Sequence, residues 1–128
     1  PLTVALNKGT ICVATVKGDI HDIGKNIVKM LLDNYGYQVI DLGRDVDPQA
    51  VLDAVRTHHI KLVGLSALMT TTVVNMAETI ELLHREAPGT LVMVGGAVLT
   101  PEYAMQIGAD FYAKDAAESA RIAAEVFG

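Results

Sequence analysis

One histidine in this chain stands in a setting that could do chemistry. In the stretch VKGDIHDIGKN, residues 16–26, His21 lies among two acids and two glycines. An imidazole at such a position can act as a general base or as a metal ligand. Asp19, two residues earlier, could accept a hydrogen bond from one ring nitrogen, which would fix the tautomer and raise the basicity of the other nitrogen. A surface histidine, or one that caps the following helix, is the commoner case, so both interpretations stay open here.

The histidines do not form the pattern of a protein-only metal site. Zinc usually takes three or four protein ligands, and one imidazole backed by one carboxylate falls short of that number. The other histidines, His58, His59 and His84, are expected in helices or at helix ends elsewhere. A single ligand is sufficient where the metal arrives already held by a macrocycle.

Two further polar stretches could join His21. Residues 66–72, SALMTTT, contain four hydroxyl side chains, at Ser66, Thr70, Thr71 and Thr72. Hydroxyls cap helices, but one cap needs one hydroxyl, so at least one of the three consecutive threonines is a candidate to face a ligand. The glycines Gly24, Gly95 and Gly96 indicate either tight backbone packing or the close passage of a ligand.

Five short apolar runs alternate with five helical patterns. Continuous apolar runs rich in β-branched residues predict buried strands, here at residues 10–16, 37–42, 61–66, 90–94 and 110–113. Apolar spacing and capping signals predict helices at residues 22–35, 48–58, 73–86, 101–107 and 116–127. In the first of these helices the residues at helical spacing are Ile23, Ile27, Met30, Leu31 and Tyr35. The expected caps are Asp47 before Pro48, Thr100 before Pro101, and Asp115 with Glu118 in a capping box.

This alternation predicts an α/β domain built on a doubly wound, five-stranded parallel sheet with helices on both faces. We expect the flavodoxin-like strand order 2-1-3-4-5, with a Rossmann-like half as the alternative. Ligands of such sheets bind beyond the carboxyl ends of the strands. That rule selects the loops at residues 17–24, 66–72 and 95–100. Residues 1–8 are expected to be a linker and residues 9–128 the domain.

The remaining polar and flexible side chains have ordinary structural interpretations. Three acids, Asp41, Asp45 and Asp47, are expected in turns and caps. Lys25 and Lys29 are expected on the solvated face of the first helix. Four methionines are expected in the core, namely Met69, Met76, Met93 and Met105.

Composition limits the class of partner. The hydrophobic fraction of 51% allows a substantial core, and the net charge of -5 argues against nucleic acid and anionic membrane surfaces. No apolar run approaches the length of about 20 residues that a membrane span needs. The single cysteine, Cys12, excludes an internal disulfide and favours a reducing, cytoplasmic compartment.

With the three loops assembled, the sequence resembles the cobalamin-binding domain family. The family's signature is D-x-H-x-x-G, then S-x-L, then G-G, one piece on each of three loops. The chain carries these pieces in order as Asp19-Ile20-His21-Asp22-Ile23-Gly24, Ser66-Ala67-Leu68 and Gly95-Gly96. The wider run VKGDIHDIGKNIV is similar to the methyl-transferring branch, which includes methionine synthase and the corrinoid proteins of methylamine and methanol metabolism.

The resemblance implies a role for each motif residue. His21 would replace the corrinoid's own lower base as cobalt ligand. Asp19 and Thr72 would be hydrogen-bonded behind it, so that the three side chains form a catalytic triad. Ser66, Leu68 and Thr70 would meet the nucleotide tail, and Gly95 and Gly96 would let the backbone lie close to the buried base. The full set implied for the cofactor is Gly18, Asp19, Ile20, His21, Asp22, Ile23, Gly24, Ser66, Leu68, Met69, Thr70, Thr72, Gly95, Gly96 and Ala97.

The resemblance also implies partners. A methyl carrier would bind cobalamin or a related corrinoid. It would shuttle a methyl group between a substrate-specific methyltransferase and an acceptor methyltransferase of the tetrahydrofolate or thiol type, and would not be a complete enzyme alone. The family generally has a helical module before this domain, and residues 1–8 would be the end of the linker to it.

Three alternatives remain. The first is the cofactor domain of an adenosylcobalamin-dependent mutase, which shares D-x-H-x-x-G but usually lacks a hydroxyl at the position of Thr72. The second is a signalling receiver, which would need a phospho-accepting aspartate where Ser66 stands. The third is a flavin carrier, whose hydroxyl-rich phosphate loop is missing after the first strand.

Overall fold

The five strands form one parallel sheet in the order β2-β1-β3-β4-β5, as predicted. The structure is a computed structural model that describes residues 8–128, so the predicted linker at residues 1–8 lies, apart from Lys8, outside the described residues. The strands are β1 (Thr10–Thr15), β2 (Gln38–Asp41), β3 (Leu62–Ser66), β4 (Leu91–Gly95) and β5 (Phe111–Tyr112). β1 pairs with both β2 and β3, which is the switch point where a crevice is expected.

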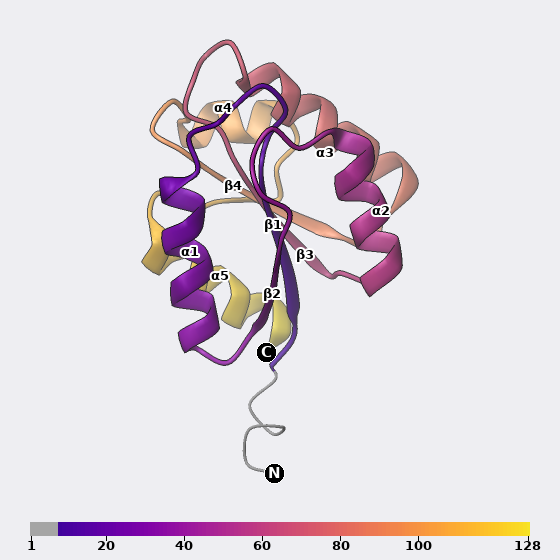
Figure 1. Cartoon of the computed structure of the whole chain (residues 1–128), viewed down its shortest axis with the longest axis vertical. Coiled ribbons are helices and arrows are strands. Elements are labelled where there is room, and N and C mark those ends of the chain that lie inside the picture. The colour runs from indigo at the N-terminus through magenta and orange to yellow at the C-terminus, as the bar shows by residue number, and fades with distance from the viewer. Residues whose placement is uncertain (1–7) are drawn as a thin grey trace.

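Helices cover both faces of the sheet (Figure 1). They are α1 (Ile23–Asn34), α2 (Pro48–His58), α3 (Val73–Glu86), α4 (Pro101–Gln106) and α5 (Ala116–Phe127). Their bounds agree with the predicted helices to within one or two residues. Two predicted caps are confirmed, since Thr100 accepts a hydrogen bond from the Tyr103 N–H and Asp115 accepts one from the Glu118 N–H. Thr72 and Asp47 occupy cap positions without capping through their side chains.

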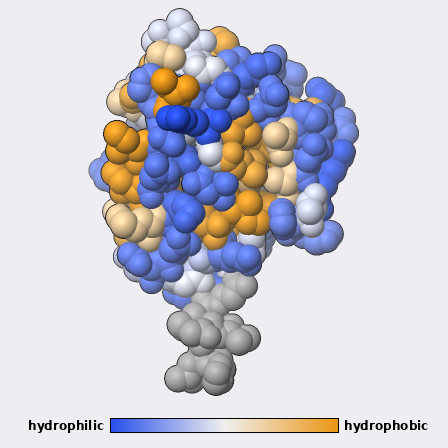
Figure 2. Space-filling view, viewed as in Figure 1, coloured by the Kyte–Doolittle hydropathy of each residue, from blue (hydrophilic) through white to orange (hydrophobic). Residues whose placement is uncertain are grey.

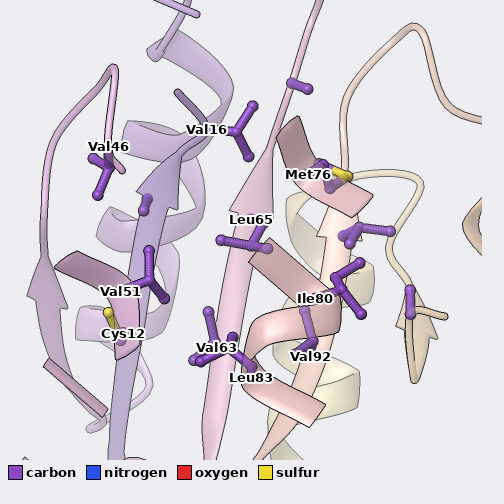
Figure 3. Packing of buried hydrophobic residues seen from close by; sticks show 14 of the residues in the cluster. Cys12, Val16, Val46, Val51, Val63, Leu65, Met76, Ile80, Leu83 and Val92 are labelled. Atoms are coloured by element: carbon purple, nitrogen blue, oxygen red, sulfur yellow. The ribbon is translucent and has the colours of Figure 1, made fainter. Parts of the chain in front are cut away.

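The alternation of side chains along each strand divides the core into two clusters. The larger cluster packs α2, α3 and α4 against one face of the sheet, and Figure 3 shows Met76, Ile80 and Leu83 of α3 among strand residues such as Val63 and Val92. The smaller cluster packs Leu32 of α1 and Ile122 of α5 against the other face. Successive strand residues point to opposite faces, so Cys12 belongs to the first cluster and Val13 to the second.

The predicted α1 helix is present, and most of its apolar stripe faces solvent, with Leu31 half-buried. Ile23, Ile27 and Met30 are 76%, 47% and 59% exposed, and Tyr35 is also exposed. Hydrophobic residues gather along the left margin of the molecule over this helix (Figures 1 and 2). The helix buries a different side, which includes Leu32.

Two smaller expectations are wrong, and a third is confirmed in part. Lys25 was expected in solvent but is buried, with Nζ 2.6 Å from Oδ1 of Asp41. Met105 was expected in the core but is exposed, whereas Met76 and Met93 are buried as predicted. Asp47 stands at the predicted N-cap position before Pro48, but its side chain pairs with Lys17 and makes no cap hydrogen bond.

Candidate functional site

The loop that carries His21 is built around the buried carboxylate of Asp19. β1 ends at Thr15, α1 begins at Ile23, and the Asp19 side chain between them is fully buried. Its two oxygens accept four hydrogen bonds. The donors and distances are the His21 N–H at 2.9 Å, His21 Nδ1 at 2.8 Å, the Leu68 N–H at 2.8 Å and Thr72 Oγ1 at 2.6 Å.

These donors decide the charge of Asp19. Burial by itself raises the pKa of a carboxyl group, because it penalises the charged form. The hydrogen bonds from Thr72, from the Leu68 N–H and from His21 outweigh that effect, so the pKa of Asp19 lies well below its usual range. Asp19 is therefore a carboxylate at neutral pH and accepts the Nδ1 proton of His21.

The imidazole of His21 is fixed at one nitrogen and accessible at the other. Nδ1 faces Asp19, and 44% of the side chain is exposed. Among the described residues no group bonds to Nε2. A neutral imidazole with its Nδ1 proton donated to a carboxylate presents a basic Nε2 lone pair to whatever lies beyond it.

Thr72 lies behind this pair. Its hydroxyl donates to Asp19 and lies 3.1 Å from the backbone carbonyl of Met69. Thr72 is the residue immediately before α3, and its hydroxyl makes no hydrogen bond to the helix N–H groups that a cap would satisfy. The three side chains of His21, Asp19 and Thr72 are thus linked in a row from the surface inward.

A cleft of about 640 Å³ opens beside His21, on the face of the sheet covered by α1 and α5. It lies at the carboxyl ends of the strands, the upper end of the sheet in Figure 1. Val13, Gly64 and Met93 form its floor, and the hydroxyls of Thr15 and Ser66, 2.9 Å apart, join the neighbouring strand ends. The crevice expected between β1 and β3 is open.

Ten of the residues predicted for a ligand line this cleft. They are Ile20, His21, Asp22, Ile23, Gly24, Ser66, Leu68, Gly95, Gly96 and Ala97. Gly18, Asp19, Met69, Thr70 and Thr72 are outside the lining. Asp19 and Thr72 support His21 from behind, while Thr70 is exposed.

The glycines at the site have different reasons to be glycine. A Cβ on Gly96 would lie 1.9 Å from the carbonyl oxygen of Ala67, and the φ of Gly96 is +136°, so this position requires glycine for backbone packing. A Cβ on Gly95 would lie 3.1 Å from the carbonyl oxygen of Ala113. A Cβ on Gly24 would have no neighbour within 4 Å, so protein packing does not explain this glycine, and it faces the cleft.

Comparison with known proteins decides the family. The sequence model of the B12 binding domain matches residues 9–124, which is nearly the whole chain. The chain belongs to the B12-binding domain family. The cofactor of this B12-binding domain is therefore cobalamin or a related corrinoid, as the motif resemblance implied.

Relatives of the B12-binding domain include corrinoid proteins of Methanosarcina species. Dimethylamine corrinoid protein 2 of Methanosarcina mazei is 44% identical over 120 residues, covering 92% of this chain and 56% of that protein. The B12-binding domain therefore spans little more than half the length of this curated relative.

Solved structures agree with that relationship. A cobalamin-binding protein from Desulfitobacterium hafniense superposes with a TM-score of 0.90 at 34% identity, over 94% of this chain and 60% of that one. A chain of the methanol:cobalamin methyltransferase complex of Methanosarcina barkeri gives 0.91 at 36% identity, over 94% and 47%. A receiver domain from Methanospirillum hungatei gives 0.69 at 16% identity, over 93% of each chain, which shows a shared fold and nothing more.

The side chains of the B12-binding domain fit a corrinoid. Within residues 8–128 no group of three His, Cys, Asp or Glu residues could hold a bare metal ion. What the cleft offers is the imidazole of His21 in its lining and a largely apolar interior that reaches the sheet. A metal that brings its own macrocycle needs no more than this from the protein.

Sequence reasoning missed the far wall of the cleft and one loop beside it. The wall comes from the end of β5 and the start of α5, including Tyr112, Ala116 and Ser119, and Arg44 contributes from the loop after β2. Gly64 inside β3 is a signal that could have pointed to the floor, because a glycine within a strand often marks the close approach of a ligand. The wall itself depends on α5 packing beside α1, which no local pattern encodes.

Proposed function

We propose that this chain is the corrinoid-binding part of a methyl carrier, with His21 as the lower ligand of cobalt in place of the corrinoid's own base. The observation that carries the proposal is the setting of His21. The residue lines the cleft, and its ring is held by Nδ1, 2.8 Å from a buried carboxylate, which leaves Nε2 as the nitrogen available to a ligand. The displaced nucleotide tail would occupy the cleft beneath.

The bound corrinoid supplies the cobalt that accepts and releases the methyl group. The protein residues supply position and charge. Asp19 orients His21 and stabilises the imidazolium that forms if Nε2 takes up a proton when it is not a ligand. Thr72 and the Leu68 N–H hold Asp19 charged, so the carboxylate remains an acceptor throughout.

The partners in this proposal are two methyltransferases. The chain would receive the methyl group from a substrate-specific methyltransferase and give it to an acceptor enzyme of the tetrahydrofolate or thiol type. Relatives described as dimethylamine corrinoid proteins, and a relative within a methanol:cobalamin methyltransferase complex, support the carrier role. The chain spans 56% and 47% of those proteins, so the role is proposed for residues 9–128 as the cofactor domain of such a system. Among residues 8–128 no helix could cross a membrane.

A mutase cofactor domain is the second candidate, because it shares the histidine motif. The 2.6 Å hydrogen bond from Thr72 to Asp19 favours methyl transfer, since mutase domains usually lack that hydroxyl. Photolysis of the native cofactor distinguishes the two candidates. A methyl product supports the carrier, and an adenosyl product would reassign the chain.

The ligand role of His21 has a direct spectroscopic test. We expect the EPR spectrum of the Co(II) form to show superhyperfine splitting from one histidine nitrogen, which changes when histidine is labelled with nitrogen-15. His21→Ala should abolish this splitting, while His84→Ala, on the far side of the sheet in α3, should keep it. A splitting pattern that is the same with and without nitrogen-15 histidine would mean that His21 does not bind cobalt.

A further inference from the structure

Lys25 is a buried cation close to the proposed cobalt ligand. It lies in the first turn of α1, is 4% exposed, and lines the cleft. A charged group so placed must be paired. Its Nζ lies 2.6 Å from Oδ1 of Asp41, at the end of β2, and 4.0 Å from Oδ2 of Asp22.

Asp41 extends this contact into the loop between β2 and α2. The same Oδ1 accepts a hydrogen bond of 2.8 Å from the Gly43 N–H. Two residues later, Asp45 has a left-handed backbone with φ of +54°. Its N–H donates to the Asp19 carbonyl at 3.0 Å, and its Oδ1 accepts from the Gly18 N–H at 2.8 Å.

These contacts form a continuous path from the start of α1, through the β2–α2 loop, back to the loop that carries His21. That loop is therefore held from two sides. Leu68 and Thr72 hold it from the side of β3 and α3, while Asp45 holds it from the side of β2, where Asp41 and Lys25 set the position of the supporting loop.

We propose that Lys25 and Asp41 are positioning residues for the cobalt ligand. Their ion pair fixes the first turn of α1 against the β2–α2 loop. The His21 ring, which precedes that turn, is thereby held in one position beside the cleft. This inference rests on the proposed function, because it assumes that His21 is the ligand.

Stability alone is a weak reason for the pair. Two charges lose their hydration on burial, and apolar side chains of similar volume are often as stable or more so. An ion pair does specify one geometry, which matters at the start of the helix that follows the ligand loop. The two roles therefore differ in the double variant, where both charges are replaced. If the pair is merely structural, restoring stability should also restore cofactor binding. If the pair positions His21, binding should stay weak even when stability is recovered.

The experiment compares Lys25→Met, Asp41→Leu and the double variant with wild type. For each protein we measure urea unfolding without cofactor, the Kd for aquacobalamin, and the histidine splitting in the Co(II) EPR spectrum. The double variant should recover most of the stability lost by the single variants. It should still bind aquacobalamin about 10 to 100 times more weakly, as when the supports of a metal ligand are removed, and should show a smaller histidine-coordinated fraction.

Lys29→Met is the matched control, since Lys29 pairs with Asp33 at 3.3 Å on the exposed side of the same helix. It should leave all three measurements unchanged. Wild-type affinity and splitting in the double variant would overturn the inference.

Should that variant fail to fold, Asp41→Asn, which keeps an oxygen for the Gly43 N–H, gives the same comparison. Weaker binding supports the inference, and unchanged binding overturns it. Failure of wild type to bind aquacobalamin or to show the splitting would instead refute the proposed function.

Discussion

Asp19 shows how one residue can serve structure and chemistry together. The carboxylate closes the contacts between the loops after β1 and β3, and it also aims the imidazole of His21. A buried carboxylate without donors would take up a proton and become neutral. It would then be a poorer acceptor for the Nδ1 proton of His21. The two backbone and two side-chain donors around Asp19 prevent that change.

The same donors predict a pH dependence of stability. The folded pKa of Asp19 lies below the unfolded value of about 3.9. Its contribution is therefore complete above that unfolded value and is lost as the pH falls through the folded pKa. We expect the free energy of unfolding of the cofactor-free protein to fall more steeply below about pH 4 in wild type than in Asp19→Asn. Urea unfolding at a series of pH values measures both slopes, and equal slopes would contradict the assigned charge of Asp19.

At the scale of the element, α1 shows what a periodic pattern can and cannot predict. The spacing of Ile23, Ile27 and Met30 indicated a helix, and its bounds are those expected to within a residue. The pattern did not indicate which side of the helix is buried. The side that faces the protein includes Lys25, whose burial depends on a partner, Asp41, sixteen residues further along the chain. Such a long-range pair cannot be predicted from local spacing.

The exposed stripe gives a stability prediction for the helix. Ile27→Gln and Met30→Gln should each change the free energy of unfolding by no more than about 0.5 kcal/mol, because both residues lie on the exposed side of the helix, 47% and 59% accessible. Leu32→Ala, on the buried side of the same helix, should cost about 2–5 kcal/mol. Urea unfolding of the three variants checks this. A large loss for Ile27→Gln would mean that its side of α1 is the packed one.

At the scale of the whole molecule, the parallel sheet brings distant loops to one edge. This convergence could be predicted, because strand type and order follow from the alternating pattern and the ligand rule selects the loops after β1, β3 and β4. The depth of the cleft could not be, since it depends on how α5 packs beside α1 over small residues such as Ala116 and Ser119. The signature motifs thus supplied the mouth of the site, while the tertiary structure supplied its floor and far wall.

The far wall gives the last prediction. Ala116 begins α5 and lines the cleft, whereas its neighbour Ala117 is exposed and does not. Ala116→Phe should fill the space that the nucleotide tail would enter, and Ala117→Phe should leave that space open. Both variants should unfold at nearly the wild-type urea concentration without cofactor. With aquacobalamin at 100 times the wild-type Kd, wild type and Ala117→Phe should gain about 2.7 kcal/mol in stability, and Ala116→Phe should gain little. Equal gains in all three proteins would mean that the corrinoid does not enter between α1 and α5, and the nucleotide tail would then have to lie elsewhere on the domain.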